Sequence, residues 1–141
     1  MLRHIGLWLL LGGLVGTQET TLIPNELRAP EYPDSAVKAK MDGTVRVAIW
    51  IQPDGIVGNA SIDASVNPML DASALKAARE WRYEPIGGDG QRKAILVFEF
   101  SVVETGPQES TCYVGPSQVT FKPPNVVKIR GWLIRSVPTH T

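Results

Sequence analysis

Three stretches of the chain alternate apolar and polar residues, which is the pattern of strands that bury one face. They cover residues 44–52, 56–64 and 94–103. Residues 53–55, Pro-Asp-Gly, separate the first two stretches; proline restricts one backbone angle there and glycine supplies a positive φ. The first two strands are therefore expected to form a hairpin, and the third to follow later in the chain.

A helical period lies between the hairpin and the third strand. Apolar or small side chains recur there at intervals of three and four, at Leu70, Ala74, Ala77, Ala78 and Trp81. Asn67 and Pro68 are typical of a helix start, and Pro85 cannot continue a helix. These residues predict a main helix at about 68–82. A shorter helix is expected at about 34–41.

This order of elements is typical of an α+β fold with one small antiparallel sheet and both helices packed on one face. Two further strands are indicated near the carboxyl end, at residues 117–121 and 126–134. Two alternatives follow for segment 104–141. It adds strands to the sheet, beside residues 94–103, or it folds only on a partner.

The amino-terminal residues resemble a secretory signal peptide. Arg3 and His4 precede an uncharged apolar run of about 12 residues, whereas a membrane-spanning helix needs roughly 20. We expect residues 1–17 to be a signal peptide, or a short anchor if they are retained, and residues 18–31 to be a lead-in.

Composition argues against several classes of function. Lys plus Arg and Asp plus Glu both total 14, so no basic field favours nucleic-acid binding. The single cysteine, Cys112, excludes an intrachain disulfide and a multi-cysteine metal site. The two histidines, His4 and His140, lie near the chain ends, and no carboxylates are paired on a helix face. We therefore predict no enzyme, no catalytic residue, no cofactor and no metal.

Five blocks of residues, in order and spacing, resemble the carboxy-terminal domain of the TonB energy-transducer family, here over residues 32–103. The blocks consist of Tyr32, Pro33 and Ala36; Gly43, Val45 and Val47; Pro53, Asp54, Gly55 and Val57; Asp71, Ala74, Leu75, Trp81, Arg82, Tyr83, Glu84 and Pro85; and Phe98 and Phe100. The resemblance implies a periplasmic domain that pairs with a short extended segment of outer-membrane receptors, the TonB box.

In this family the strand matching residues 94–103 offers the free edge for that pairing, by β-augmentation. The candidate partner-binding residues on or near this edge are Ile95, Val97, Glu99, Ser101 and Arg82. A packed aromatic and proline corner, with two turns, is expected from the structural motif residues Tyr32, Pro33, Gly43, Asp54, Gly55, Trp81, Tyr83 and Pro85.

Two functions follow as expectations. The first is a periplasmic TonB-like protein-binding domain that serves energy-dependent transport across the outer membrane. Its partners would be outer-membrane TonB-dependent receptors, and inner-membrane motor proteins if the amino-terminal segment stays attached on the periplasmic side of the inner membrane. The second is a structural or interaction module of the cell envelope that does not transduce energy, with its sheet edge closed by its own tail or within a homodimer.

Overall fold

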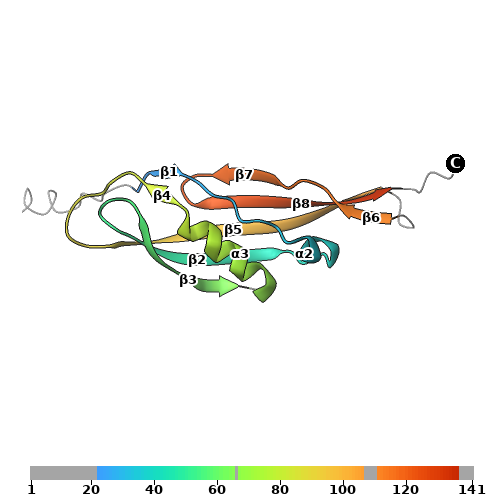
Figure 1. Cartoon of the computed structure of the whole chain (residues 1–141), viewed down its shortest axis with the longest axis horizontal. Coiled ribbons are helices and arrows are strands. Elements are labelled where there is room, and N and C mark those ends of the chain that lie inside the picture. Colours follow the sequence, from blue (N-terminus) through green and yellow to red (C-terminus); the bar gives the residue numbers. More distant parts are fainter. Residues whose placement is uncertain (1–21, 66, 107–110, 137–141) are drawn as a thin grey trace, which may run out of the picture.

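The computed structural model describes residues 22–65, 67–106 and 111–136 (Figure 1). Two helices lie among eight strands in this part of the chain. In chain order the elements are β1 (Pro24–Glu26), α2 (Asp34–Lys38), β2 (Gly43–Ile51), β3 (Val57–Ser65), α3 (Pro68–Arg79), β4 (Arg82–Tyr83), β5 (Arg92–Thr105), β6 (Thr111–Val114), β7 (Gln118–Lys122) and β8 (Val126–Ser136).

The main sheet has the strand order β3-β2-β5-β8-β6, and β7 pairs with β8 beside β6. Strand β2 runs antiparallel to both of its neighbours, β3 and β5, whereas β5 and β8 run parallel to each other. The α+β class and the antiparallel arrangement of the three expected strands are confirmed, and the added strand β8 makes the whole sheet a mixed one. The reason is the path of the chain after β5: β6 and β7 both run antiparallel to β8, so β8 returns in the direction of β5.

Both expected carboxy-terminal strands are present, as β7 and β8, so the segment after residue 104 adds strands to the sheet. The predictions for β2, β3, β5 and β8 end within two residues of the observed bounds. Strands β1, β4 and β6 were not expected. They have at most four residues each, which is too short for a period of two to stand out.

Helix α3 begins as the sequence indicates, since the side chain of Asn67 accepts a hydrogen bond from the Met69 N–H at 3.1 Å. It ends at Arg79, three residues before the expected end. Trp81 leaves the helix, and its indole Nε1–H donates to the Arg28 carbonyl at 2.8 Å. The tryptophan therefore ties the lead-in to the core instead of completing the last helical turn.

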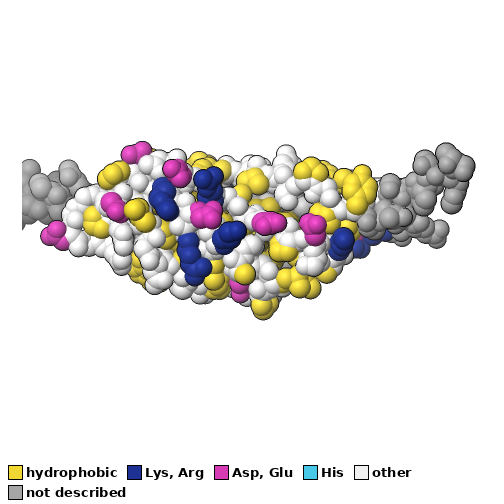
Figure 2. Space-filling view, viewed as in Figure 1, with side chains coloured by type: hydrophobic (Ala, Val, Ile, Leu, Met, Phe, Trp, Pro, Cys, Tyr) yellow, Lys and Arg dark blue, Asp and Glu magenta, His cyan; other side chains and the backbone are white. Residues whose placement is uncertain are grey.

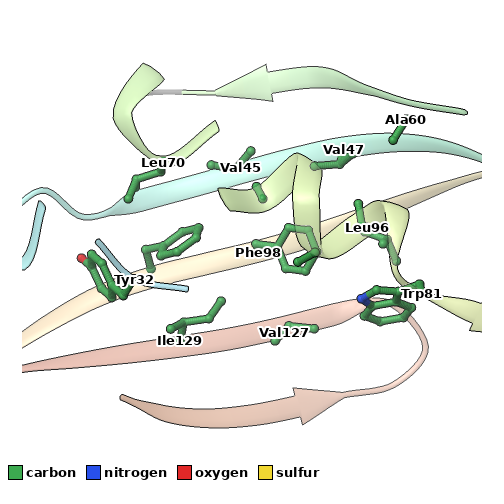
Figure 3. Close-up of a cluster of buried hydrophobic side chains, with 14 of the residues drawn as sticks. Tyr32, Val45, Val47, Ala60, Leu70, Trp81, Leu96, Phe98, Val127 and Ile129 are labelled. Carbon is green, nitrogen blue, oxygen red and sulfur yellow. The ribbon is translucent and has the colours of Figure 1, made fainter. Parts of the chain in front are cut away.

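The core lies between the sheet and the two helices, which cover the same face (Figures 1 and 3). The apolar faces of β2 and β5 and the small residues of α3 are buried, as the alternation and the helical period predicted. Figure 3 shows Tyr32 on the same side of the core as Ile129, and Trp81 near Val127. The ring centroids of Trp81 and Phe121 are 6.0 Å apart. Strand β7, which carries Phe121, therefore shares one core with the elements that precede it in the chain.

The corner expected from aromatic and proline residues is present in part. Tyr32, Trp81 and Tyr83 are buried, Pro33 is half-buried, and Pro85 is exposed. Gly55 has φ +90°, and a Cβ atom there would lie 1.9 Å from the Tyr83 carbonyl oxygen. The hairpin turn therefore needs glycine both for its backbone angle and because β4 lies directly against it.

The face that carries the helices has interspersed charges and no patch of a single sign (Figure 2). Within residues 22–65, 67–106 and 111–136, neither helix has the length and apolar character needed to span a membrane. The predicted signal peptide at residues 1–17 lies outside the described residues.

Candidate functional site

Strand β5, the expected docking edge, lies inside the sheet. Residues 92–100 pair with β2 on one side, and residues 97–105 pair with β8 on the other. The prediction that this strand is a free edge is therefore wrong. Its apolar alternation was interpreted correctly, but alternation reports which face is buried and says nothing about which strands lie on either side.

Asn125 covers part of the start of β5, where β8 has not yet begun. Its side-chain Nδ2–H donates to the Ile95 carbonyl at 2.7 Å, and its own carbonyl accepts from the Val97 N–H at 2.9 Å. The Ile95 carbonyl and the Val97 N–H, which face away from β2, are thus already used by the chain itself.

Strand β8 is fixed by core packing as well as by backbone pairing. Val127, Ile129 and Leu133 are buried on its inner face. Between them, Gly131 lies against the helix layer, where a Cβ atom would approach the Tyr32 ring to 2.8 Å and Val37 to 2.9 Å. The residues of the expected 32–103 domain therefore share their core with the carboxy-terminal strand.

A charged cluster ties the far ends of β5 and β8 to the segment after α2. Glu104 Oε1 is 2.8 Å from Lys40 Nζ and 2.9 Å from Arg135 Nη2. Hydrogen bonds from Lys40 and Arg135 hold the pKa of the Glu104 carboxyl below its usual value. These three side chains are partly exposed, so the cluster orients the strand ends more than it stabilises the fold.

The outer edge of β3 is the first place where strand pairing remains open. The backbone N–H of Val97 in β5 points away from β2, toward β8. Its antiparallel partner Arg46 in β2 therefore points its backbone N–H and C=O away from β5, toward β3. Because these directions alternate along a strand, the backbone groups of Ala48 and Trp50 also face β3. The β3 partners Asn59 and Ser61 use their backbone groups on β2.

The groups of Ala60 and Ile62 consequently point away from the sheet. The Ala60 N–H is hydrogen-bonded to the Asn59 side-chain Oδ1 at 2.9 Å, a contact that a strand with a neighbour on that side would not need. Irregular pairing at both ends of β3 confines the free run to residues 59–62. Figure 1 shows this strand at the outer margin of the sheet.

Strand β7 forms the other margin. The backbone groups of Thr120 face β8. By the same alternation, those of its neighbours Val119 and Phe121 point away from the sheet. Pro116 precedes this strand and Pro123 and Pro124 follow it. Prolines beside an edge strand limit further pairing, so β7 is a more protected edge than the middle of β3.

The side chains expected to contact a partner lie on the sheet face opposite the helices, except for one. Ile95, Val97 and Glu99 are half-buried there and Ser101 is exposed. Arg82 is in β4, away from β5, and its Nη1–H group donates to the carbonyls of Arg79 and Trp81. The structure therefore brings together Glu99 and Ser101 and separates Arg82 from them.

Glu99 and Ser101 belong to a shallow polar hollow of about 290 Å³ on this open face. Four residues of the late strands complete it, and the full lining is Glu99, Ser101, Gln118, Thr120, Lys128 and Arg130. Sequence reasoning did not select the last four as site residues. The alternation of Lys128 and Arg130 with buried residues placed them on the solvent face, but not beside β5.

No group of three or more histidine, cysteine, aspartate or glutamate side chains in the described ranges is arranged to hold a metal ion. The candidate site instead consists of backbone edges and an open sheet face, two features through which a sheet can bind an extended peptide.

Residues 28–102 match the sequence profile described as Gram-negative bacterial TonB protein C-terminal, which is just over half of the chain. The chain belongs to this family. Proteins of the family are energy transducers rather than enzymes, so membership confirms the prediction that the chain is not an enzyme.

The relatives agree with this assignment. Protein TonB of Xanthomonas campestris pv. campestris is 33% identical over 69 residues, which cover 48% of this chain and 31% of that protein. Protein TonB of Escherichia coli K12 is 39% identical over 57 residues, covering 40% of this chain and 24% of that protein. The chain thus spans a third or less of the length of these relatives.

The solution NMR structure of the Pseudomonas aeruginosa TonB carboxy-terminal domain has a similar fold. The TM-score is 0.50 at 29% identity, over 59% of this chain and 88% of the other. Because the family match ends at residue 102, strands β6, β7 and β8 lie beyond it.

Proposed function

We propose that this chain is a TonB-like, periplasmic protein-binding domain that pairs with an extended segment of an outer-membrane receptor and serves energy-dependent transport across the outer membrane. The family match over residues 28–102 carries the proposal. The relatives named Protein TonB support the same process, and the open sheet supports the mode of binding.

The docking edge in this proposal is β3 and not β5. The predicted β5 edge is occupied by nine residue pairs with β8, whereas residues 59–62 of β3 have outward backbone groups at Ala60 and Ile62. A visiting strand would gain the Ile62 N–H and the carbonyls of Ala60 and Ile62. Since only four residues are free, the pairing would be short and readily reversed.

The test is titration of the whole chain with a synthetic TonB-box peptide, followed by amide hydrogen exchange. Replacing Asn59 by alanine frees the Ala60 N–H to bond the peptide. Asn59→Ala should therefore bind the peptide about fivefold more tightly than the parent chain, which is the gain in affinity expected from one additional hydrogen bond. Ile62→Pro removes an outward N–H that β2 does not use, and should abolish binding.

Val119→Pro is the matched control, because it removes an outward N–H from the other edge strand; binding should not change. Bound peptide should slow exchange at Ile62. If Ile62→Pro and Val119→Pro both bind as the parent does, β3 is not the docking edge. If no form binds the peptide, receptor pairing itself is refuted.

One observation favours a second function. The chain's own strand β8 occupies the side of β5 that the family resemblance assigns to a receptor segment. A chain whose docking edge is permanently closed fits a structural or interaction module of the cell envelope that does not transduce energy. Failure of every form to bind the peptide, with the fold intact, would select this function.

A further inference from the structure

The carboxy-terminal strands create a second surface, distinct from the sheet edge, on the face that the helices leave open. The polar hollow on this face is built from two cross-strand rows. Glu99, Lys128 and Thr120 form one row, and Ser101, Arg130 and Gln118 form the next. In each row a long cationic side chain of β8 lies between two shorter side chains of β5 and β7.

The charges in the hollow favour an anion. Lys128 Nζ is 3.6 Å from Glu99 Oε2, so one cation is partly compensated by the acid. The Arg130 side chain makes no ion pair or hydrogen bond with the part of the chain that the structure describes. Its guanidinium is flanked by the hydroxyl of Ser101 and the amide of Gln118, both able to donate. A planar guanidinium with such neighbours suits a carboxylate, which it can bind through two parallel hydrogen bonds.

Apolar side chains continue the same face beyond the hollow. Trp132, two residues after Arg130, is half-buried and lies opposite Val103. Tyr113 lies opposite Ile134 and is 50% exposed. Same-face positions on a strand are about 7 Å apart. A ligand that fills both regions therefore carries an acidic group and an apolar group at that separation.

We propose that this open face, centred on Arg130 and Trp132, is a docking site for an extended acidic segment of a partner protein that has an apolar side chain two residues from its carboxylate. An extended peptide places alternate side chains on one side at the spacing that the face requires. The site is an addition made by the late strands, because four of its six polar residues lie after residue 102, where the family match ends.

This site does not rest on strand addition at β3. It uses side chains on a sheet face, whereas the β3 proposal uses backbone groups on an edge that β2 and β5 separate from β8. Ile62→Pro should therefore leave binding at the open face unchanged, so the two proposals can fail separately.

The test uses the blocked hexapeptide Thr-Glu-Thr-Phe-Thr-Thr with the whole chain. In an NMR titration it should shift the Arg130 side-chain and Trp132 indole signals. The same peptide with Gln in place of Glu should bind at least tenfold more weakly. This is the loss of affinity expected when one charge-assisted hydrogen bond on a partly solvated surface is removed. Arg130→Gln should cause an equal loss.

The two changes should not add, because both remove the same contact. Arg46→Gln is the matched control: Arg46 is an exposed arginine on the same face, but Asp63 compensates it at 3.4 Å, and its loss should not alter binding. Equal affinities for the Glu and Gln peptides would overturn the proposal. Self-association of the chain that Arg130→Gln abolishes would also overturn it, in favour of a second copy as the occupant.

Discussion

At the scale of single residues, small side chains decide where the late strand can lie. Gly131 faces the ring of Tyr32, whose hydroxyl donates to the Met41 carbonyl and whose ring packs edge-on against Phe100 at 5.1 Å. Tyr32 is thus held by residues of the family-matched region while it rests on a glycine outside that region. One missing Cβ atom allows the two parts of the chain to share a core.

Replacing that glycine should therefore cost stability. In Gly131→Ala the new methyl group would lie 2.8 Å from the Tyr32 ring and 2.9 Å from Val37, so the helix layer must shift. We expect a loss of about 1–3 kcal/mol in the free energy of unfolding, measured by urea denaturation. Gly90→Ala is the control, since nothing lies within 4 Å of a Cβ atom there. Equal effects of the two substitutions would contradict the packing argument.

At the scale of elements, β8 is an internal strand of the sheet whose inner face belongs to the core. It pairs with β5 on one side and with β6 and β7 on the other, and its inner face contributes three buried residues. Removing the tail would therefore uncover Phe98, Phe100 and Trp81 as well as the edge of β5. For this reason point substitutions on β3 are sharper tests of receptor pairing than truncation after β5.

The burial of β8 makes a direct prediction. Ile129→Ala should lower the free energy of unfolding by about 2–5 kcal/mol, because it leaves a cavity in the core where Ile129 is fully buried. Arg130→Ala, the next residue but on the solvent face, should change it by at most about 0.5 kcal/mol. Thermal unfolding of both variants measures the contrast. A small effect of Ile129→Ala would mean that the strand is only loosely attached.

The element scale also shows how far prediction from sequence reaches. The strands at 44–52, 56–64 and 94–103 and the main helix could be predicted because alternation and helical period are local properties. The end of the helix could not, since Trp81 leaves it to bond the Arg28 carbonyl 53 residues earlier in the chain. The candidate edge residues Ile95 and Val97 were placed on the correct strand, but the neighbours of that strand are a non-local matter.

At the scale of the whole molecule, one helix layer covers one face of a six-stranded sheet and leaves the other face open (Figure 1). The covered face holds two buried tyrosines. Burial raises the pKa of Tyr83 to about 12, and burial together with the nearby Asp42 carboxylate raises that of Tyr32 to about 12. The open face carries the charged pairs, such as Arg46 with Asp63 and Lys128 with Glu99.

These tyrosines predict a loss of stability at alkaline pH. The unfolded chain releases both phenol protons near pH 10, whereas the folded chain keeps them until about pH 12. Above pH 10 the unfolded state therefore binds fewer protons, and the free energy of unfolding falls as the pH rises towards 12. Urea denaturation at pH 9 and pH 11 measures the decrease. In Tyr83→Phe the decrease should be smaller than in the parent chain, and an undiminished decrease would refute this assignment.

The sequence by itself determined the strand faces, the helix start at Asn67, the hairpin turn at Gly55 and the family, because each depends on residues close together in the chain or on a motif read in order. Only the tertiary structure decided that β8 lies beside β5, that β5 is therefore not an edge strand, and that Arg130 and Ser101 share one hollow. The physical reason is that strand pairing and shared packing join segments far apart in sequence, and the alternation within each strand is the same whichever neighbour it takes.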